Sequence, residues 1–420
     1  MKKTEVFLLA IFTLVLFWGL SVRAENGEIA KATQYWENRA TQGMTEKAIA
    51  TLETLLKTEP NYYEALWKLG CYYQYLGDIS FGKSRMDAYK KGLFYTQRAI
   101  RVKGQVASGH LWHALLIGSI LLEKPEFNSS KLSNQMAAEL QLVLHLEPQN
   151  ALAHLTLARY CDGVFGRGSL YDKKKAQQEA GLALKYAPEI PNGWLVLGGI
   201  AQENNDFITA KTAYARFLDG NDPFKNYSGL IRQENQVSDY ESLWHLGYFY
   251  EFMGQNCPDK KIKIMLLEKG LVFLDRAKKT NPGGVAGHLY RAILLGNIGL
   301  EKGILSSLGM VKPMVDELQT VVALEPGNAM AHAMLGQIYW RAPGKPISVG
   351  NKQKALDETA LAVKYDPNSI AYWFNYGKIA VDNKNYNLAR MAFTKVMGFF
   401  GGAPSFKNEA QQELIKLSRV

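Results

Sequence analysis

The stretch NGWLVLGGIAQENNDFITAKTAYARFL, residues 192–218, decides the fold. Its first part repeats apolar residues every three or four positions from Trp194 onward, which predicts one face of a helix. After a short polar turn a second such face follows. The small residues Gly198 and Ala210 let the two helix axes approach closely, and Pro223 ends the unit. The spacing therefore predicts a helix pair, with Trp194 in its core.

The same frame recurs along the chain, for example around Leu66, around Ala153 and around Trp373, which is expected to be a core residue like Trp194. We count nine helix pairs, five before a polar segment at residues 219–238 and four after it. No segment shows the alternation of a strand. The fold class is thus expected to be all-α.

The chain also repeats over a longer distance. ELQLVLHLEPQNALAH at 139–154 returns as ELQTVVALEPGNAMAH at 317–332, with 11 of 16 residues identical. YEALWKLG at 63–70 returns as YESLWHLG at 240–247, with six of eight identical. The spacing between copies stays close to 178 residues. The sequence is therefore interpreted as an internal duplication.

Boundaries follow from these patterns. Lys2 and Lys3, the apolar run Val6–Leu20 and the pair Val22/Ala24 are typical of a cleaved secretory signal peptide, with an uncleaved N-terminal anchor as the alternative. Export to a bacterial periplasm is expected. The predicted divisions are listed in chain order: signal peptide 1–24, first array 25–220, connector 221–238, second array 239–401 and C-terminal capping helix 402–420.

The spacing of large, small, small and aromatic residues, then proline, resembles the tetratricopeptide (TPR) repeat superfamily over nearly all of residues 28–400. This resemblance implies an α-solenoid, a right-handed superhelix of helix pairs. Its concave groove would take up a peptide or protein segment, and the family implies no catalytic residue.

A second resemblance rests on residues 324–368, above all on the insertion PGKPISVG at 343–350. It is similar to exported bacterial TPR proteins related to the T component of TRAP transporters. That likeness implies a solute-binding transporter subunit as a possible partner. The chain lacks the lipobox of those proteins and is twice as long.

Sequence motifs give no support for catalysis or a cofactor. No nucleophile, P-loop or zinc-protease motif is present, so the chain is predicted not to be an enzyme. His110 and His113 are spaced like metal ligands, but the copy replaces His113 by Arg291; we expect no metal, and a surface position for His113. The net charge of +10 comes without a long basic run, so nucleic acid is not expected as a partner.

Some first-helix positions should point into the groove rather than into the core. Trp67/Trp244, Glu64/Glu241 and His154/His332 are retained in both copies, either for binding or as residues that have not drifted. The groove candidates are Glu64, Trp67, His154, Glu241, Trp244, Tyr248, His332 and Trp340.

Two functions follow as hypotheses. The first is an exported, non-catalytic scaffold that binds a protein or peptide segment through aromatic anchors in its groove. The second is a periplasmic accessory of a TRAP-type transporter, which could hold a small apolar ligand. Neither requires a cofactor, and stable membrane insertion is not expected once the signal segment is cleaved.

Overall fold

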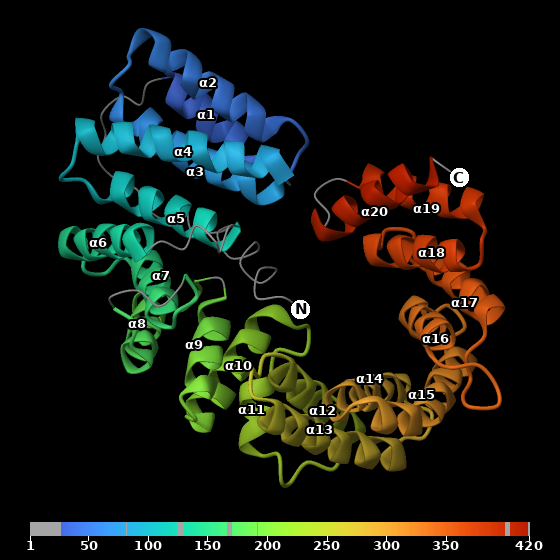
Figure 1. The fold of residues 1–420 in the computed structure, drawn as a ribbon. Coiled ribbons are helices and arrows are strands. Elements are labelled where there is room, and N and C mark those ends of the chain that lie inside the picture. Colours follow the sequence, from blue (N-terminus) through green and yellow to red (C-terminus); the bar gives the residue numbers. More distant parts are fainter. Residues whose placement is uncertain are drawn as a thin grey trace. The chain divides into compact units, whose positions relative to one another are not determined.

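The structure is a computed structural model that describes residues 27–80, 82–123, 130–165, 170–190, 192–399 and 404–418 (Figure 1). The expected signal peptide, 1–24, lies outside the described residues. Among the described helices, none is both long and apolar enough to cross a membrane. The chain divides into two compact units between Ala213 and Tyr214, a point that falls inside helix α10.

The first unit consists of helices in sequential pairs. They are α1 (Gly27–Glu37), α2 (Met44–Thr58), α3 (Tyr63–Ile79), α4 (Gly82–Val102), α5 (Ala107–Glu123), α6 (Ser130–Leu146), α7 (Ala151–Cys161), α8 (Lys173–Tyr186), α9 (Gly193–Glu203) and α10 (Phe207–Asn221).

The second unit begins at Tyr214, inside α10, and is also built of successive helices. Its helices are α11 (Tyr227–Arg232), α12 (Tyr240–Gln255), α13 (Lys260–Thr280), α14 (Val285–Lys302), α15 (Ile304–Leu324), α16 (Ala329–Arg341), α17 (Lys352–Tyr365), α18 (Ile370–Asp382), α19 (Tyr386–Gly398) and α20 (Pro404–Leu417). Within the described residues, the only strand-like pairing is one isolated bridge between Gly344 and Gly350. Within each unit most successive helices pack on one another along the chain, so the predicted all-α solenoid is confirmed.

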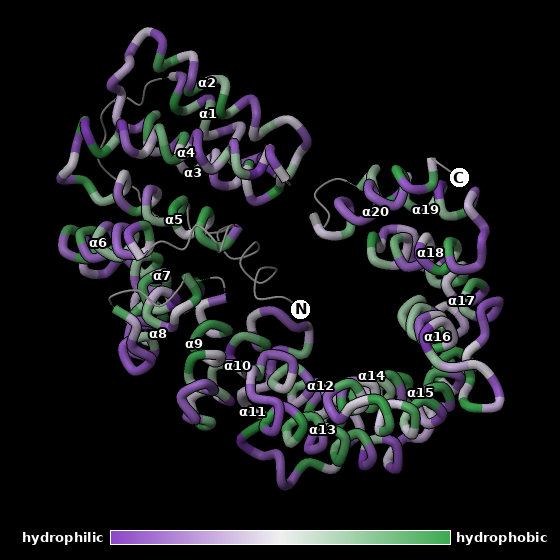
Figure 2. Tube along the Cα trace, in the orientation of Figure 1, coloured by the Kyte–Doolittle hydropathy of each residue, from purple (hydrophilic) through white to green (hydrophobic). Residues whose placement is uncertain are grey.

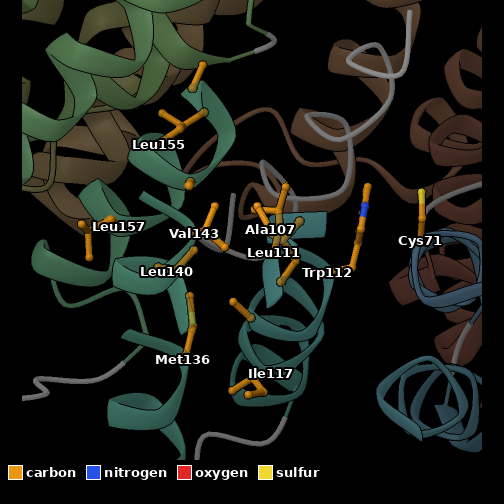
Figure 3. Packing of buried hydrophobic residues seen from close by; sticks show 14 of the residues in the cluster. Cys71, Ala107, Leu111, Trp112, Ile117, Met136, Leu140, Val143, Leu155 and Leu157 are labelled. Carbon is orange, nitrogen blue, oxygen red and sulfur yellow. The ribbon is translucent and has the colours of Figure 1, made fainter. Parts of the chain in front are cut away.

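Apolar residues form stripes along the helices, and the stripes are buried where neighbouring helices meet. Figure 2 shows green and purple residues alternating along each helix, as expected for amphipathic helices that bury one face. Figure 3 shows part of this packing, in which Met136, Leu140 and Val143 of α6 lie opposite Leu111 and Ile117 of α5. Except for Leu111, these side chains are almost completely excluded from solvent. Burial of this kind is the main source of stability in a repeat array.

Small residues set how closely paired helices approach. A Cβ atom added to Gly70 of α3 would lie 2.2 Å from the Thr96 side chain of α4. At the corresponding position of α12, a Cβ on Gly247 would lie 2.4 Å from Leu274 of α13. Both glycines are therefore required by close helix packing, as the repeat pattern indicates.

Equivalent hydrogen bonds in the two copies support the internal duplication. The hydroxyl of Tyr63 accepts from the amide of Gly109 at 3.2 Å, and the hydroxyl of Tyr240 accepts from the amide of Gly287 at 3.0 Å. The insertion loops also close alike, although their sequences differ. The amide of Asp172 donates to the Cys161 carbonyl, and the amide of Asn351 donates to the Tyr339 carbonyl, at 3.0 and 2.8 Å.

Two short elements flank the second array. The segment 221–238, which the sequence predicts to be an irregular connector, contains helix α11, held by bonds from the amides of Tyr227 and Ser228 to the Asp219 carboxylate. At the other end, α20 packs on α18 and α19 and buries Ala410 and Leu417. The domain boundaries themselves stay predictions.

Candidate functional site

A continuous stack of aromatic rings crosses the first helices α12 and α14 of the second unit. Trp244 and Tyr290 lie almost parallel, with ring centroids 5.6 Å apart and planes 8° apart. Tyr248, one helical turn after Trp244, packs on Tyr290 at 5.1 Å. The His245 ring lies 3.5 Å from that of Trp244, and the Phe224 ring lies 3.8 Å from that of His245. We call these five rings the aromatic stack.

The stack has a buried support and a partly exposed front. His245 is buried, and Tyr227 of α11 is fully buried against His245 and Phe249. Trp244, Tyr248 and Tyr290 are only partly buried. Because their neighbours hold the rings in place, little conformational entropy is left to lose when a ligand binds to them.

Carboxylates surround the partly exposed rings. Trp244 donates its indole N–H to Glu241 Oε2 at 2.8 Å. One turn beyond Tyr248, Glu251 accepts from the Asn297 side-chain amide at 3.1 Å. Burial raises the pKa of Glu251, and two hydrogen bonds, from Gln255 and Asn297, oppose that rise.

Negative charges also act on the tyrosines of the stack. Burial is the main cause of the raised pKa of Tyr290, and the charges of Asp222 and Glu251 add to it. Burial, the neighbouring Tyr290 and these two carboxylates likewise raise the pKa of Tyr248. The front of the stack therefore combines partly exposed aromatic rings with neighbouring negative charge, which favours an apolar group that carries a cation.

The first copy differs at the same positions. Trp67 is partly buried, but Cys71 and Trp112, which correspond to Tyr248 and Tyr290, are almost completely buried. The Lys68 ammonium lies 3.1 Å from the Glu64 carboxylate and 5.8 Å from the Trp67 ring. The first copy thus places a lysine of its own beside its tryptophan and glutamate, whereas the second copy has His245 at the position of Lys68.

The structure brings together three of the groove candidates, Glu241, Trp244 and Tyr248. Glu64 and Trp67 lie on α3 of the first unit. Trp340, at the end of α16, donates its indole N–H to Asp382 Oδ2 at 2.6 Å and so joins α16 to the end of α18.

The two remaining candidates, His154 and His332, are buried side chains, and their expected groove-facing position is corrected. His154 Nδ1 lies 2.6 Å from Glu179 of α8, and its Nε2 lies 3.0 Å from the Pro148 carbonyl in the preceding turn. His332 makes the same contacts to Glu358 and to the Pro326 carbonyl, at 2.7 and 2.9 Å. Both histidines tie a helix pair to the turn before it.

This histidine clasp occurs in two further pairs, where His110 contacts Glu139 and the Gly104 carbonyl, and His288 contacts Glu317 and the Pro282 carbonyl. A carbonyl oxygen can only accept, so Nε2 must donate to it. For His154, burial lowers the pKa of the ring, but its hydrogen bonds to Glu179 and to the Pro148 carbonyl outweigh that effect and raise the pKa overall.

Three other expectations are also corrected. His113 is buried instead of lying on the surface, with its Nδ1 3.1 Å from the Thr96 hydroxyl. Trp194 and Trp373 are only partly buried and not core residues. Each donates its indole N–H at 2.9 Å to a turn carbonyl six residues earlier, Pro188 and Pro367 respectively, as the clasp histidines do.

Sequence reasoning missed Tyr290, Phe224 and Asn297 as parts of the site. Tyr290 has a usable signal, because it corresponds to Trp112 of the first copy and lies in the repeated GHLYRAILLG segment. Phe224 has no such signal, since it lies in the non-repeating connector and reaches the stack only through the fold. Within the described part of the chain, no group of His, Cys, Asp and Glu side chains is suitable for holding a metal ion.

A protein-family model matches the chain twice, over residues 29–178 and 213–341, together about two thirds of its length. The model describes regulator of microtubule dynamics protein 1-3. The two matched segments correspond to the two halves of the duplication. No curated protein matches the chain.

Solved structures resemble the chain at low identity. A crystal structure of MamA protein has 16% identity, covers 53% of this chain and 92% of its own, and has a TM-score of 0.31. TTC0263, a thermophilic TPR protein of Thermus thermophilus, has 18% identity, coverages of 55% and 99%, and a TM-score of 0.30. A structure of Naa15/Naa10 bound to HypK-THB has 11% identity, coverages of 93% and 66%, and a TM-score of 0.29.

Proposed function

The chain belongs to the regulator of microtubule dynamics protein 1-3 family, and from that premise we propose that it is a non-catalytic scaffold that binds a basic, extended segment of a partner protein on the aromatic stack. The observation that carries this proposal is the partly exposed front of the stack, with Glu241 and Glu251 beside it. Partly exposed, preorganised aromatic rings with a polar surround are typical of anchor sites in protein interfaces.

The duplicated copy supports a basic partner. In the first unit, Lys68 places its ammonium beside Trp67 and Glu64. In the second unit the equivalent residue, His245, is buried within the stack. A lysine or arginine of the partner would take the place next to Trp244 and Glu241 that Lys68 takes in the first copy.

A site-specific crosslink tests this proposal. Tyr248 is replaced by the photoreactive residue benzoylphenylalanine in the full chain, with the same replacement at Phe94, which is exposed on α4, as the control. We expect irradiation in cell extract to link a partner through a peptide rich in Lys or Arg at position 248 and not at position 94. Equal crosslinking at both positions, or a linked peptide without basic residues, would contradict the proposal.

The family description adds a second candidate, because it names microtubule dynamics. The net charge of +10 favours binding to an acidic protein polymer of that kind. Co-sedimentation of the full chain with polymerised tubulin tests it directly. Sedimentation that persists in Trp244→Ala would show that a surface other than the aromatic stack binds the polymer.

Location rests on the sequence alone. The signal-peptide pattern in residues 1–24 leads us to propose export, whereas a role at microtubules requires the compartment that contains them. The intact mass of the purified protein distinguishes these cases, since cleavage after Ala24 removes the first 24 residues.

The transporter-accessory alternative is proposed only from the resemblance of residues 324–368. The insertion loop is closed by a bond from the Gly350 amide to the Pro343 carbonyl at 2.8 Å, and Ile347 lies exposed on it. A solute-binding transporter subunit that crosslinks at position 347 and not at position 248 would favour this alternative.

A further inference from the structure

Successive helix–helix turns of the second unit lie along one edge of its solenoid. Because the two helices of each pair run in opposite directions and pack on the next pair, α12, α14 and α16 end at this edge and α13, α15 and α17 begin there. Ion pairs join the first two turns, Lys263 to Glu301 at 3.0 Å and Lys302 to Glu268 at 2.5 Å. We give the name lysine–aliphatic edge to nine exposed residues of these turns: Lys260, Lys261, Met265, Leu300, Lys302, Ile304, Leu305, Lys345 and Ile347. Two acidic residues, Asp259 and Glu268, are exposed beside them.

The aliphatic side chains of this edge are unusually exposed. The exposed fractions are 76% for Leu300, 81% for Ile304 and 87% for Leu305, and 73% for Ile347 in the next turn. Single exposed aliphatic residues are ordinary on protein surfaces. Three within six consecutive residues at the tip of one turn form a convex apolar projection, which is a mark of an interaction site.

Gly303 makes this projection possible. The turn from α14 to α15 is a single residue, with Gly303 at φ 98° and ψ −177°, a conformation open essentially to glycine alone. Helix α15 therefore begins at once with Ile304 and Leu305. Both side chains lie on the first turn of a helix at the edge of the unit, beyond the contacts of the helix pair.

Exposed lysines surround the aliphatic residues. Lys302 precedes the Gly303 turn, Lys260 and Lys261 open α13, and Lys345 lies two residues before Ile347. The turns at the opposite edge carry the exposed lysines Lys279 and Lys364 together with the acidic residues Glu325 and Asp366. The lysine–aliphatic edge thus combines positive charge with aliphatic tips.

We propose that the lysine–aliphatic edge docks reversibly on an anionic lipid surface, with Leu300, Ile304 and Leu305 entering the boundary between headgroups and acyl chains. Lysines attract the anionic headgroups, and aliphatic side chains gain by leaving water. An acidic protein surface would match the charge of the lysines but not the aliphatic side chains. A second copy of the chain would bring its own lysines against these, so like charges oppose that pairing.

A fluorescent label confined to the edge tests the proposal without interference from the apolar segment Val6–Leu20. In the full chain, Leu305→Cys carries an environment-sensitive fluorophore, and Lys279→Cys at the end of α13, on the opposite edge, is the matched control. The three native cysteines are buried, so the introduced cysteine reacts selectively. The probe is a phosphatidylcholine vesicle with about 30 mol% phosphatidylglycerol, compared with phosphatidylcholine alone.

We expect the emission at position 305 to rise several-fold and shift to the blue with anionic vesicles only, and the emission at position 279 to stay unchanged. Lys260→Glu combined with Lys261→Glu should abolish the response, as should high salt. No response at position 305, or an equal response at position 279, overturns the proposal. A response without vesicles that grows with protein concentration assigns the edge to self-association, and a response to acidic protein but not to lipid assigns it to a protein partner. Both results also overturn it.

Discussion

The indole ring of Trp244 on α12 lies parallel to the phenol ring of Tyr290 on α14, with centroids 5.6 Å apart and planes 8° apart. The two residues are 46 positions apart and belong to consecutive repeats, so the stack joins one repeat to the next. A side chain in this position contributes both to the packing of the repeats and to any surface that they present. Substitutions can separate the two contributions.

Trp244→Ala is expected to lower stability modestly and to weaken partner binding strongly. Each ring pair contributes about 0.5–1.5 kcal/mol, and a partly exposed residue leaves a smaller cavity than a core one. Trp36→Ala is the control, since Trp36 is buried and stacks on Tyr72 at 4.2 Å; its loss should cost about 3–5 kcal/mol. Urea unfolding and the position-248 crosslink measure the two effects. Equal destabilisation by both variants would identify Trp244 as a core residue.

Gly247→Ala is expected to destabilise the second unit by about 1–3 kcal/mol through overpacking. The new Cβ would lie 2.4 Å from Leu274, and no room is left between α12 and α13. Gly309→Ala is the matched control, because a Cβ at that helical position meets nothing within 4 Å. Removing a helical glycine there should stabilise by about 1 kcal/mol. A lower melting temperature for Gly247→Ala and a higher one for Gly309→Ala would confirm this. Changes of the same sign in both variants would contradict it.

The spacing of small and aromatic residues predicts the helix pairs correctly, because close helix approach demands glycine or alanine at fixed positions. Gly70 and Gly247 show this directly. The duplication is equally visible in the sequence, since both copies retain the residues that hold the pairs together. The front of the stack can be predicted only in part. Phe224 belongs to a segment without periodicity, so the repeat pattern does not predict where its side chain lies.

Four of the misplaced residues, His154, His332, Trp194 and Trp373, share one repeat position. The sequence predicts His154 in the groove and Trp194 in the core, yet both donate a ring N–H to a carbonyl six residues earlier. Helical periodicity shows that such a residue is on the inner side of its helix. It does not show whether the side chain turns toward the second helix, the groove or the preceding turn. His154, His332, Trp194 and Trp373 all follow the preceding turn at the same spacing. This constant spacing is the feature of the sequence that indicates a bond to the turn carbonyl.

The clasp at His154 predicts a loss of stability as the pH rises. Burial lowers the pKa of His154, but hydrogen bonds to Glu179 and to the Pro148 carbonyl outweigh it, and the pKa is raised overall. The stabilisation is therefore complete below the unfolded value of about 6.5 and is lost as the pH passes the folded value. Glu179→Gln removes the charged partner and should flatten this dependence. Urea midpoints of both proteins across neutral pH measure it; unchanged dependence in the variant would exclude the clasp as the cause.

Asp78 at the end of α3 predicts a second pH effect, over a lower range. Burial raises the pKa of Asp78 to about 7, against the hydrogen bond from Tyr89 and the charge of Arg85, which act to lower it. Folding then favours the protonated acid, so this group's contribution falls as the pH rises from about 4, the unfolded value, to about 7.

Asp78→Asn keeps an acceptor for the Tyr89 hydroxyl, which donates to Asp78 Oδ1 at 2.8 Å, and removes the charge. The variant should match the wild type near pH 4. Above pH 7 it should be more stable by up to about 4 kcal/mol, since each pH unit between the unfolded and folded pKa values corresponds to about 1.4 kcal/mol. Parallel urea-midpoint profiles for Asp78→Asn and wild type from pH 4 to pH 8 would show that Asp78 ionises normally in the folded protein.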